Sequence, residues 1–298
     1  MTLVDPPGRQ GPGPLADEAL SRLDLGVARR AGGVLPGERR APGLGSGTEL
    51  AQLRPYEPGD DPRLLDPAAS APTGVAHVRQ HVPERALTTW IVHDVSASIA
   101  FGTGLRLKSD VAEGAATTVA QLAVRRGGRV AVITAGAPDA VTLPPRGGRR
   151  AFAAVRRLAG GGVAPDLAAT ELPLGAALDR VARLARARGL VTVVSDFRDE
   201  GWQAPLRALG RRHTLTAIEI ADPREADLPD AGLLVLMDPE TGELVEADTT
   251  SRRARAAFAA AEARRRAGVA QALRRARAHQ VTLSTDADWL RELARVLG

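Results

Sequence analysis

Short apolar runs of β-forming residues alternate with stretches of helical periodicity from residue 87 to the end of the chain. The run at 87–92 has apolar residues without helical spacing, which is typical of a buried strand. This alternation predicts an α/β fold with a Rossmann-like, mainly parallel sheet flanked by helices. The expected strands are 87–92, 130–135, 190–195, 213–220, 232–237 and 280–284, and the expected helices are 106–125, 149–158, 174–188, 251–279 and 286–297.

The region before residue 87 differs in character. Its first residues are rich in proline and glycine, which predicts a disordered tail. A helix is expected at 15–31, and the alternating pattern at 75–82 predicts a strand that runs antiparallel beside 87–92 as an edge of the sheet. The expected division is a tail at 1–14, an extension with the edge strand at 15–86 and the α/β domain at 87–298.

Composition excludes several kinds of chemistry. Of the 298 residues, 44% are hydrophobic but only 3% aromatic, so alanine, leucine and valine must form the core. The chain has no cysteine, which excludes disulfides, zinc–thiolate sites and thiol nucleophiles. The sequence contains neither a signal-peptide pattern nor ~18 consecutive apolar residues. We therefore expect no membrane span and a cytoplasmic location.

The positive charge is almost entirely arginine. The formal net charge is +5 and the sequence pI about 10.8, and Lys108 is the only lysine. An arginine-rich helix at 251–279 allows a nucleic-acid binder as one alternative function. Few aromatic residues accompany these arginines, so a solvated surface is the favoured interpretation. Nucleic acid is therefore not the expected partner.

The run at 87–92 leads to a cluster of oxygen donors. Asp94, Ser96 and Ser98 follow it with the spacing Asp-x-Ser-x-Ser, so a loop at the end of the strand carries three oxygen ligands. Mg²⁺ prefers oxygen ligands and keeps several waters, so this pattern predicts a partial shell for a hard divalent cation. The alternative is an ordinary strand-to-helix loop in which these residues act as caps.

Two further oxygen donors are expected at the same edge. The run at 190–195 ends in Asp196, and ligands of open parallel sheets bind outside the carboxyl ends of strands near the switch in strand order. Asp94 and Asp196 could therefore face one site. Thr170 precedes the helix expected at 174–188, where its hydroxyl could join the site or cap the helix.

The segment from Arg54 to Asp66 is rich in charge and has little hydrophobic periodicity. Asp60, Asp61 and Arg63 could buttress a charged site. The favoured interpretation is a turn held by local Asx hydrogen bonds and surface ion pairs.

Asp94, Ser96, Ser98, Thr170 and Asp196 together resemble the metal-ion-dependent adhesion site (MIDAS) of von Willebrand factor A (vWA) domains. The longer motifs resemble those of the DUF58 family of A-domain-like proteins: Arg54-Pro-Tyr-Glu-Pro-Gly-Asp-Asp-Pro-Arg63, Val193-Val-Ser-Asp-Phe197, Arg212-His213 and Asp238-Pro-Glu-Thr-Gly-Glu243. The chain departs from the family pattern at Asp66-Pro67, at Ala71-Pro72-Thr73 and at Thr170-Glu171, where Thr-Asp is usual.

The resemblance implies a vWA-like domain at 87–298 that holds Mg²⁺ or Mn²⁺. Ser96 and Ser98 would bind the cation directly, Thr170 would add an oxygen, and Asp94 and Asp196 would act largely through water. Neutral hydroxyls leave the cation able to accept a carboxylate from another protein. The resemblance therefore implies a non-enzymatic protein-binding module, an adaptor that works with a MoxR-type AAA+ ATPase.

The enzymatic alternative is a haloacid-dehalogenase-like phosphotransferase, which also has an aspartate after a buried strand. That chemistry needs a second carboxylate two residues later, where this chain has Ser96. We also expected no downstream lysine to serve such a site.

Overall fold

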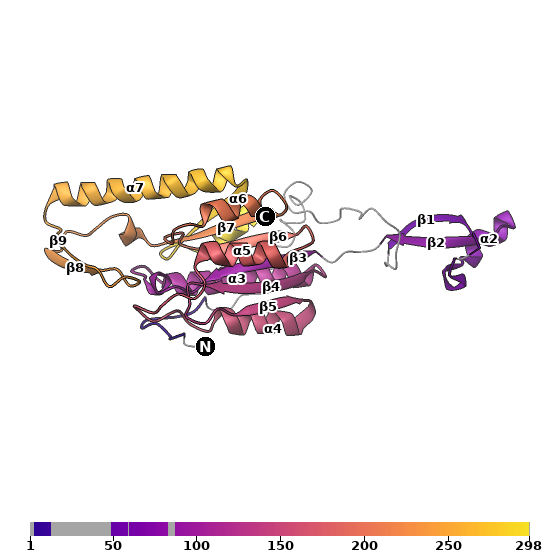
Figure 1. Cartoon of the computed structure of the whole chain (residues 1–298), viewed down its shortest axis with the longest axis horizontal. Coiled ribbons are helices and arrows are strands. Elements are labelled where there is room, and N and C mark those ends of the chain that lie inside the picture. Colours follow the sequence, from indigo (N-terminus) through magenta and orange to yellow (C-terminus); the bar gives the residue numbers. More distant parts are fainter. Residues whose placement is uncertain (1–2, 13–48, 59, 83–86, 298) are drawn as a thin grey trace. The chain divides into compact units, whose positions relative to one another are not determined.

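The computed structural model describes residues 3–12, 49–58, 60–82 and 87–297. The chain divides into two compact units, one of residues 1–35 and 87–298 and the other of residues 36–86. Each unit is described by itself (Figure 1). The helix expected at 15–31 lies outside the described residues.

The larger unit is built on a six-stranded sheet with the order β10-β7-β6-β3-β4-β5. Five strands are parallel, and β5 joins β4 antiparallel at one edge, so the sheet is mixed. The expected α/β fold is therefore confirmed. The strands are β3 (Thr88–Asp94), β4 (Arg129–Ala135), β5 (Thr142–Arg146), β6 (Leu190–Ser195), β7 (Thr214–Ala221) and β10 (Ala278–Ser284).

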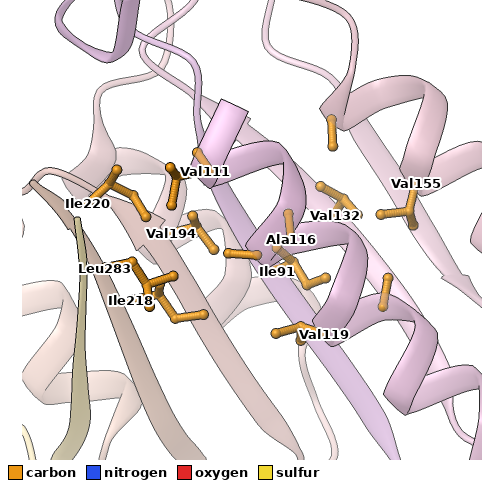
Figure 2. Packing of buried hydrophobic residues seen from close by; sticks show 14 of the residues in the cluster. Ile91, Val111, Ala116, Val119, Val132, Val155, Val194, Ile218, Ile220 and Leu283 are labelled. Atoms are coloured by element: carbon orange, nitrogen blue, oxygen red, sulfur yellow. The ribbon is translucent and has the colours of Figure 1, made fainter. Parts of the chain in front are cut away.

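Helices cover both faces of this sheet. Alternate residues of each strand point to opposite faces, so Ile91 packs in one hydrophobic cluster while Trp90 and Val92 pack in the other. The Ile91 cluster includes Val111 and Val155 from the helices that cover its face (Figure 2). The helices are α3 (Lys108–Arg125), α4 (Gly148–Ala159), α5 (Leu174–Leu184), α6 (Gln203–Leu209), α7 (Arg252–Arg275) and α8 (Trp289–Leu297).

A two-stranded hairpin leaves the main sheet between β7 and α7. It pairs β8 (Leu233–Met237) with β9 (Leu244–Asp248) through the turn expected at Asp238–Gly242. Among the helices that the structure describes, none combines the length and apolarity needed to cross a bilayer.

The N-terminal expectations need two corrections. Residues 3–12 were expected in a disordered tail, yet Val4 forms a β-bridge with Val163 and Arg9 forms an ion pair with Glu113 of α3. The strand at 75–82 was expected beside 87–92, but β2 (His77–Val82) pairs instead with β1 (Glu49–Pro55) in a separate antiparallel sheet. The antiparallel edge of the main sheet is therefore β5, which the sequence did not predict.

The smaller unit holds the charged segment expected to form either a turn or a buttress. Arg54 donates two hydrogen bonds to Asp60, at 2.8 and 2.6 Å. Asp61 caps the short 3₁₀ helix η1 (Pro62–Leu64), and Asp66 caps α2 (Pro67–Thr73). The contacts are local, as the turn interpretation requires.

Candidate functional site

The candidate site lies where the two central strands of the sheet end. β3 and β6 are parallel neighbours, with His93 opposite Val194. From β3 the chain continues to β4 on one side and later crosses to β6 on the other, so the strand order reverses between these two strands. This is the switch point at which open α/β sheets bind ligands. Asp94 and Asp196 leave the sheet here, as the sequence predicted.

Asp94 is held rigidly by three hydroxyl and amide donors. Its Oδ1 accepts hydrogen bonds from the backbone nitrogen of Ser96 at 2.9 Å and from Ser96 Oγ at 2.7 Å. Its Oδ2 accepts one from Ser195 Oγ at 2.5 Å. The 3₁₀ helix η2 (Ala97–Ala100) follows directly and brings Ser98 Oγ to 3.1 Å from Ser96 Oγ. The Asp-x-Ser-x-Ser motif is therefore one compact group of oxygens.

A cavity of about 60 Å³ opens beside this group. Thr170 lines it, so the sequence-predicted Thr170 reaches the same place as Asp94 and Ser96. Thr170 does not cap α5, because Asp199 Oδ2 accepts the hydrogen bond from the Leu174 nitrogen at 2.6 Å. The lining includes Asp94, Ser96, Gly136, Thr170, Asp199 and Glu240.

Asp196 lies next to the cavity but not on its wall. Its Oδ2 accepts a hydrogen bond from Lys108 Nζ at 2.7 Å, and the same nitrogen lies 2.6 Å from Glu225 Oε1. All three side chains are buried or nearly so. Asp196 is therefore neutralised by a lysine, whereas the other four predicted residues form the cavity or contact those that do.

The electrostatics differ between the two aspartates. Burial and then the charge of Asp196 raise the pKa of Asp94 to about 7, against hydrogen bonds from Ser195 and Ser96 that act to lower it. Burial would also raise the pKa of Asp196, but the charge and hydrogen bond of Lys108 and the contacts of Arg198 together outweigh burial and hold that pKa below its usual range. A cation in the cavity would favour the charged form of Asp94.

The donor set suits a hard cation that completes its coordination shell with water. Within the described ranges, no group of three or more histidine and acidic side chains is arranged to hold a metal. Asp94, Ser96 and Thr170 line the cavity, and Ser98 Oγ lies 3.1 Å from Ser96 Oγ. Hydroxyls and a carboxylate fit Mg²⁺ or Mn²⁺, which accept oxygen ligands together with water.

Sequence reasoning missed four residues of this region. Lys108 is the single lysine of the chain. Composition makes it conspicuous but does not indicate that it pairs with Asp196. The expectation that no downstream lysine serves the site was wrong, because Lys108 follows Asp94 and contacts Asp196. The sequence marks Ser195 only as the end of a strand, and no motif marks Asp199. Glu240 was noted only within the hairpin turn, which gave no sign of its place at the cavity.

The family model described as "Protein of unknown function DUF58" matches residues 52–268. The chain therefore belongs to this family. The uncharacterized protein Rv1480 of Mycobacterium tuberculosis is 39% identical over 279 residues, covering 93% of this chain and 87% of the relative. The uncharacterized protein MAV169 of Mycobacterium avium is 43% identical over 123 residues, covering 41% of this chain and 72% of the relative.

Among solved structures, the chain is similar to an aerotolerance-related membrane protein from Bacteroides fragilis. The identity is 14% and the TM-score 0.46, with 71% of this chain and 98% of that chain covered. These values are too low to support an argument about fold or function.

Proposed function

We propose that the cavity at the end of β3 binds a divalent cation, Mg²⁺ or Mn²⁺, and that the chain is a non-enzymatic module that recognises other proteins through it. The single observation that supports this proposal best is the cavity lined by Asp94, Ser96 and Thr170, with Ser98 Oγ 3.1 Å from Ser96 Oγ. A cavity of about 60 Å³ admits a cation with a few waters, since one water needs on the order of 10–15 Å³.

The five residues have separate roles in this proposal. Ser96 and Ser98 bind the cation directly and Thr170 adds an oxygen. Asp94 orients Ser96 and supplies negative charge, largely through water. Asp196 also acts at a distance, which agrees with its direct pairing to Lys108. Bound there, the cation supplies positive charge that attracts a carboxylate.

The proposal includes a vWA-like fold with a metal-ion-dependent adhesion site. Counted along the larger unit from β3, the strand order is 3-2-1-4-5-6, with the third strand antiparallel at the edge. This is the doubly wound order, and its switch point coincides with the Asp-x-Ser-x-Ser motif. The coincidence of fold and motif supports the adhesion-site interpretation over a loop of helix-capping residues.

The partner in this proposal presents an acidic residue. We propose a MoxR-type AAA+ ATPase, for which this chain would be the adaptor, and this part rests on the family resemblance of the sequence motifs. A phosphotransferase is disfavoured because Ser96 stands where that chemistry needs a second carboxylate, and because Lys108 is engaged by Asp196 and Glu225.

Calorimetric titration of the full chain with Mg²⁺ and with Mn²⁺ tests the cation. We expect binding by the wild type and none by Asp94→Ala, with circular dichroism verifying that the variant is folded. Asp166→Asn, an exposed carboxylate outside the cavity lining, is the matched control and should bind like the wild type. Equal binding by wild type and Asp94→Ala would remove the basis of the proposed function.

A further inference from the structure

The turn of the β8–β9 hairpin is locked by its first residue. Oδ1 of Asp238 accepts hydrogen bonds from the backbone nitrogens of Glu240 at 2.8 Å and Thr241 at 3.0 Å. The backbone of Asp238 also bonds to Gly242 and Glu243, at 2.8 and 2.9 Å. Because these four contacts close the turn on itself, the position of Glu240 relative to the hairpin is fixed.

The same turn is anchored to the segment that carries Thr170. The carbonyl oxygen of Pro239 accepts a hydrogen bond from the Leu167 nitrogen at 2.8 Å. Gly242 passes so close to Leu167 that an added Cβ would lie 2.8 Å from its side chain. The hairpin therefore docks beside the cavity through two contacts that do not involve Glu240 itself.

Docking in this position brings the Glu240 carboxylate to the candidate metal site. Glu240 lines the cavity together with Asp94, Ser96 and Thr170.

The charges of the side chains around the cavity do not favour a carboxylate at the position of Glu240. Of the described residues that line it, three are acidic and none is cationic. Asp199 is occupied at the start of α5, and Lys108 is held by Asp196 and Glu225. Glu240 is exposed to solvent, and a cation in the cavity would offset the repulsion between its carboxylate and those of Asp94 and Asp199.

We propose that Glu240 is an intramolecular ligand of the cation: the hairpin supplies the carboxylate that completes the coordination shell, in the place that an acidic residue of a partner would take. This inference rests on the proposed function, because it assumes a cation at Ser96 and Ser98. It adds that partner binding requires the Glu240 carboxylate to leave. The hairpin is then a self-ligand that competes with the partner's acidic residue.

The test compares three forms of the full chain: wild type, Glu240→Gln and Glu243→Gln. Glu243 is exposed in the same turn and uses its backbone rather than its side chain in the turn contacts, so its variant is the matched control. Mn²⁺ affinity is measured by calorimetry, and water-proton relaxation reports the waters bound to Mn²⁺. Acetate is then added to each Mn²⁺-loaded form as a small carboxylate probe.

We expect Glu240→Gln to lower Mn²⁺ affinity at least about tenfold, since loss of even an outer-shell partner costs about 10- to 100-fold. Its relaxation enhancement should exceed that of the wild type, because water replaces the lost carboxylate, and acetate should reverse that increase. Glu243→Gln should match the wild type in all three measurements.

The outcomes separate the two proposals. If the wild type binds no Mn²⁺, the proposed function fails and the self-ligand fails with it. If the wild type binds Mn²⁺ and Glu240→Gln shows the same affinity and relaxation, the cation site stands and the self-ligand is overturned. An affinity loss in Glu243→Gln equal to that in Glu240→Gln would also overturn it, because the effect would then come from the hairpin charge in general.

Discussion

The ammonium nitrogen of Lys108 lies 2.7 Å from Oδ2 of Asp196, and both side chains are about 1% exposed. Glu225 Oε1 lies 2.6 Å from the same nitrogen. Burial would lower the pKa of Lys108, but the charges of Asp196 and Glu225 outweigh it and raise that pKa. Lys108 thus compensates two carboxylates beside the candidate site, and Arg198 Nε adds a second contact to Glu225 at 3.0 Å.

Lys108→Met should destabilise the protein strongly. The variant keeps most of the volume of the side chain but leaves Asp196 without its buried cation, while Glu225 keeps its ion pair with Arg198. Removing one partner of a buried ion pair typically costs 3–5 kcal/mol, and we expect a loss of about that size in the free energy of unfolding. Urea denaturation of wild type and variant at neutral pH measures it.

A double variant tests the reason for that loss. Lys108→Met combined with Asp196→Asn removes the buried charge that the single variant leaves without a cation, and it should recover part of the stability lost by Lys108→Met alone. A loss below about 1 kcal/mol in the single variant, or no recovery in the double variant, would contradict the buried-pair explanation.

The meeting of Asp94 and Asp196 could be predicted from the sequence. Both follow short, continuously apolar runs, and such runs form parallel strands whose carboxyl ends lie at one edge. The structure pairs β3 with β6 and brings these ends together. The sequence could not show that Asp196 turns toward Lys108, because that contact spans 88 positions and depends on how α3 packs.

The two antiparallel pairings were harder to predict. β5 contains Pro144 and Pro145, which argue against a strand, but proline is tolerated at a sheet edge where one side makes no ladder bonds. β2 has the alternation of a half-covered strand, and that pattern does not specify its partner. The sequence therefore predicts a strand at 75–82, which the structure has at His77–Val82, but assigns it to the wrong neighbour.

Glu240 shows a different limit of sequence reasoning. Turn residues placed it correctly at the tip of a hairpin, because Asp238 and Gly242 have clear local roles. Where the hairpin docks depends on the contact of Pro239 with Leu167, which no local pattern encodes. Residues that reach a site through tertiary docking are therefore the ones that motif spacing misses.

Asp222 should make stability depend on acid pH. This fully buried carboxylate accepts hydrogen bonds from Thr103 Oγ1 and Thr285 Oγ1, both at 2.6 Å. Burial acts to raise its pKa, but these hydrogen bonds outweigh burial and lower it from 3.8. A lowered folded-state pKa stabilises the protein above about pH 4, and this contribution disappears as the pH falls through the folded-state value.

Asp222→Asn should therefore cost about 1–3 kcal/mol at pH 7, and the difference from wild type should shrink below pH 4. Urea unfolding at several pH values between 7 and 3 measures both quantities. Asp227→Asn, an exposed carboxylate five positions further on, is the control and should stay within ~0.5 kcal/mol of wild type throughout. If the difference in the free energy of unfolding between wild type and Asp222→Asn stays constant with pH, the charge of the Asp222 carboxylate is not its origin.

Gly136→Ala should damage the candidate site through Ser96. Gly136 has φ +82°, and an added Cβ would lie 2.6 Å from Ser96 Cβ and 2.8 Å from the Ser96 backbone nitrogen. The left-handed conformation costs alanine about 1–2 kcal/mol, and forced overlap adds about 1–3 kcal/mol.

Gly127→Ala has φ +70° with nothing within 4 Å, so it isolates the conformational cost. Urea unfolding should show a larger loss for Gly136→Ala, and Mg²⁺ titration should show weakened binding in that variant alone. Equal stability loss in both would mean that Gly136 serves the backbone rather than the position of Ser96.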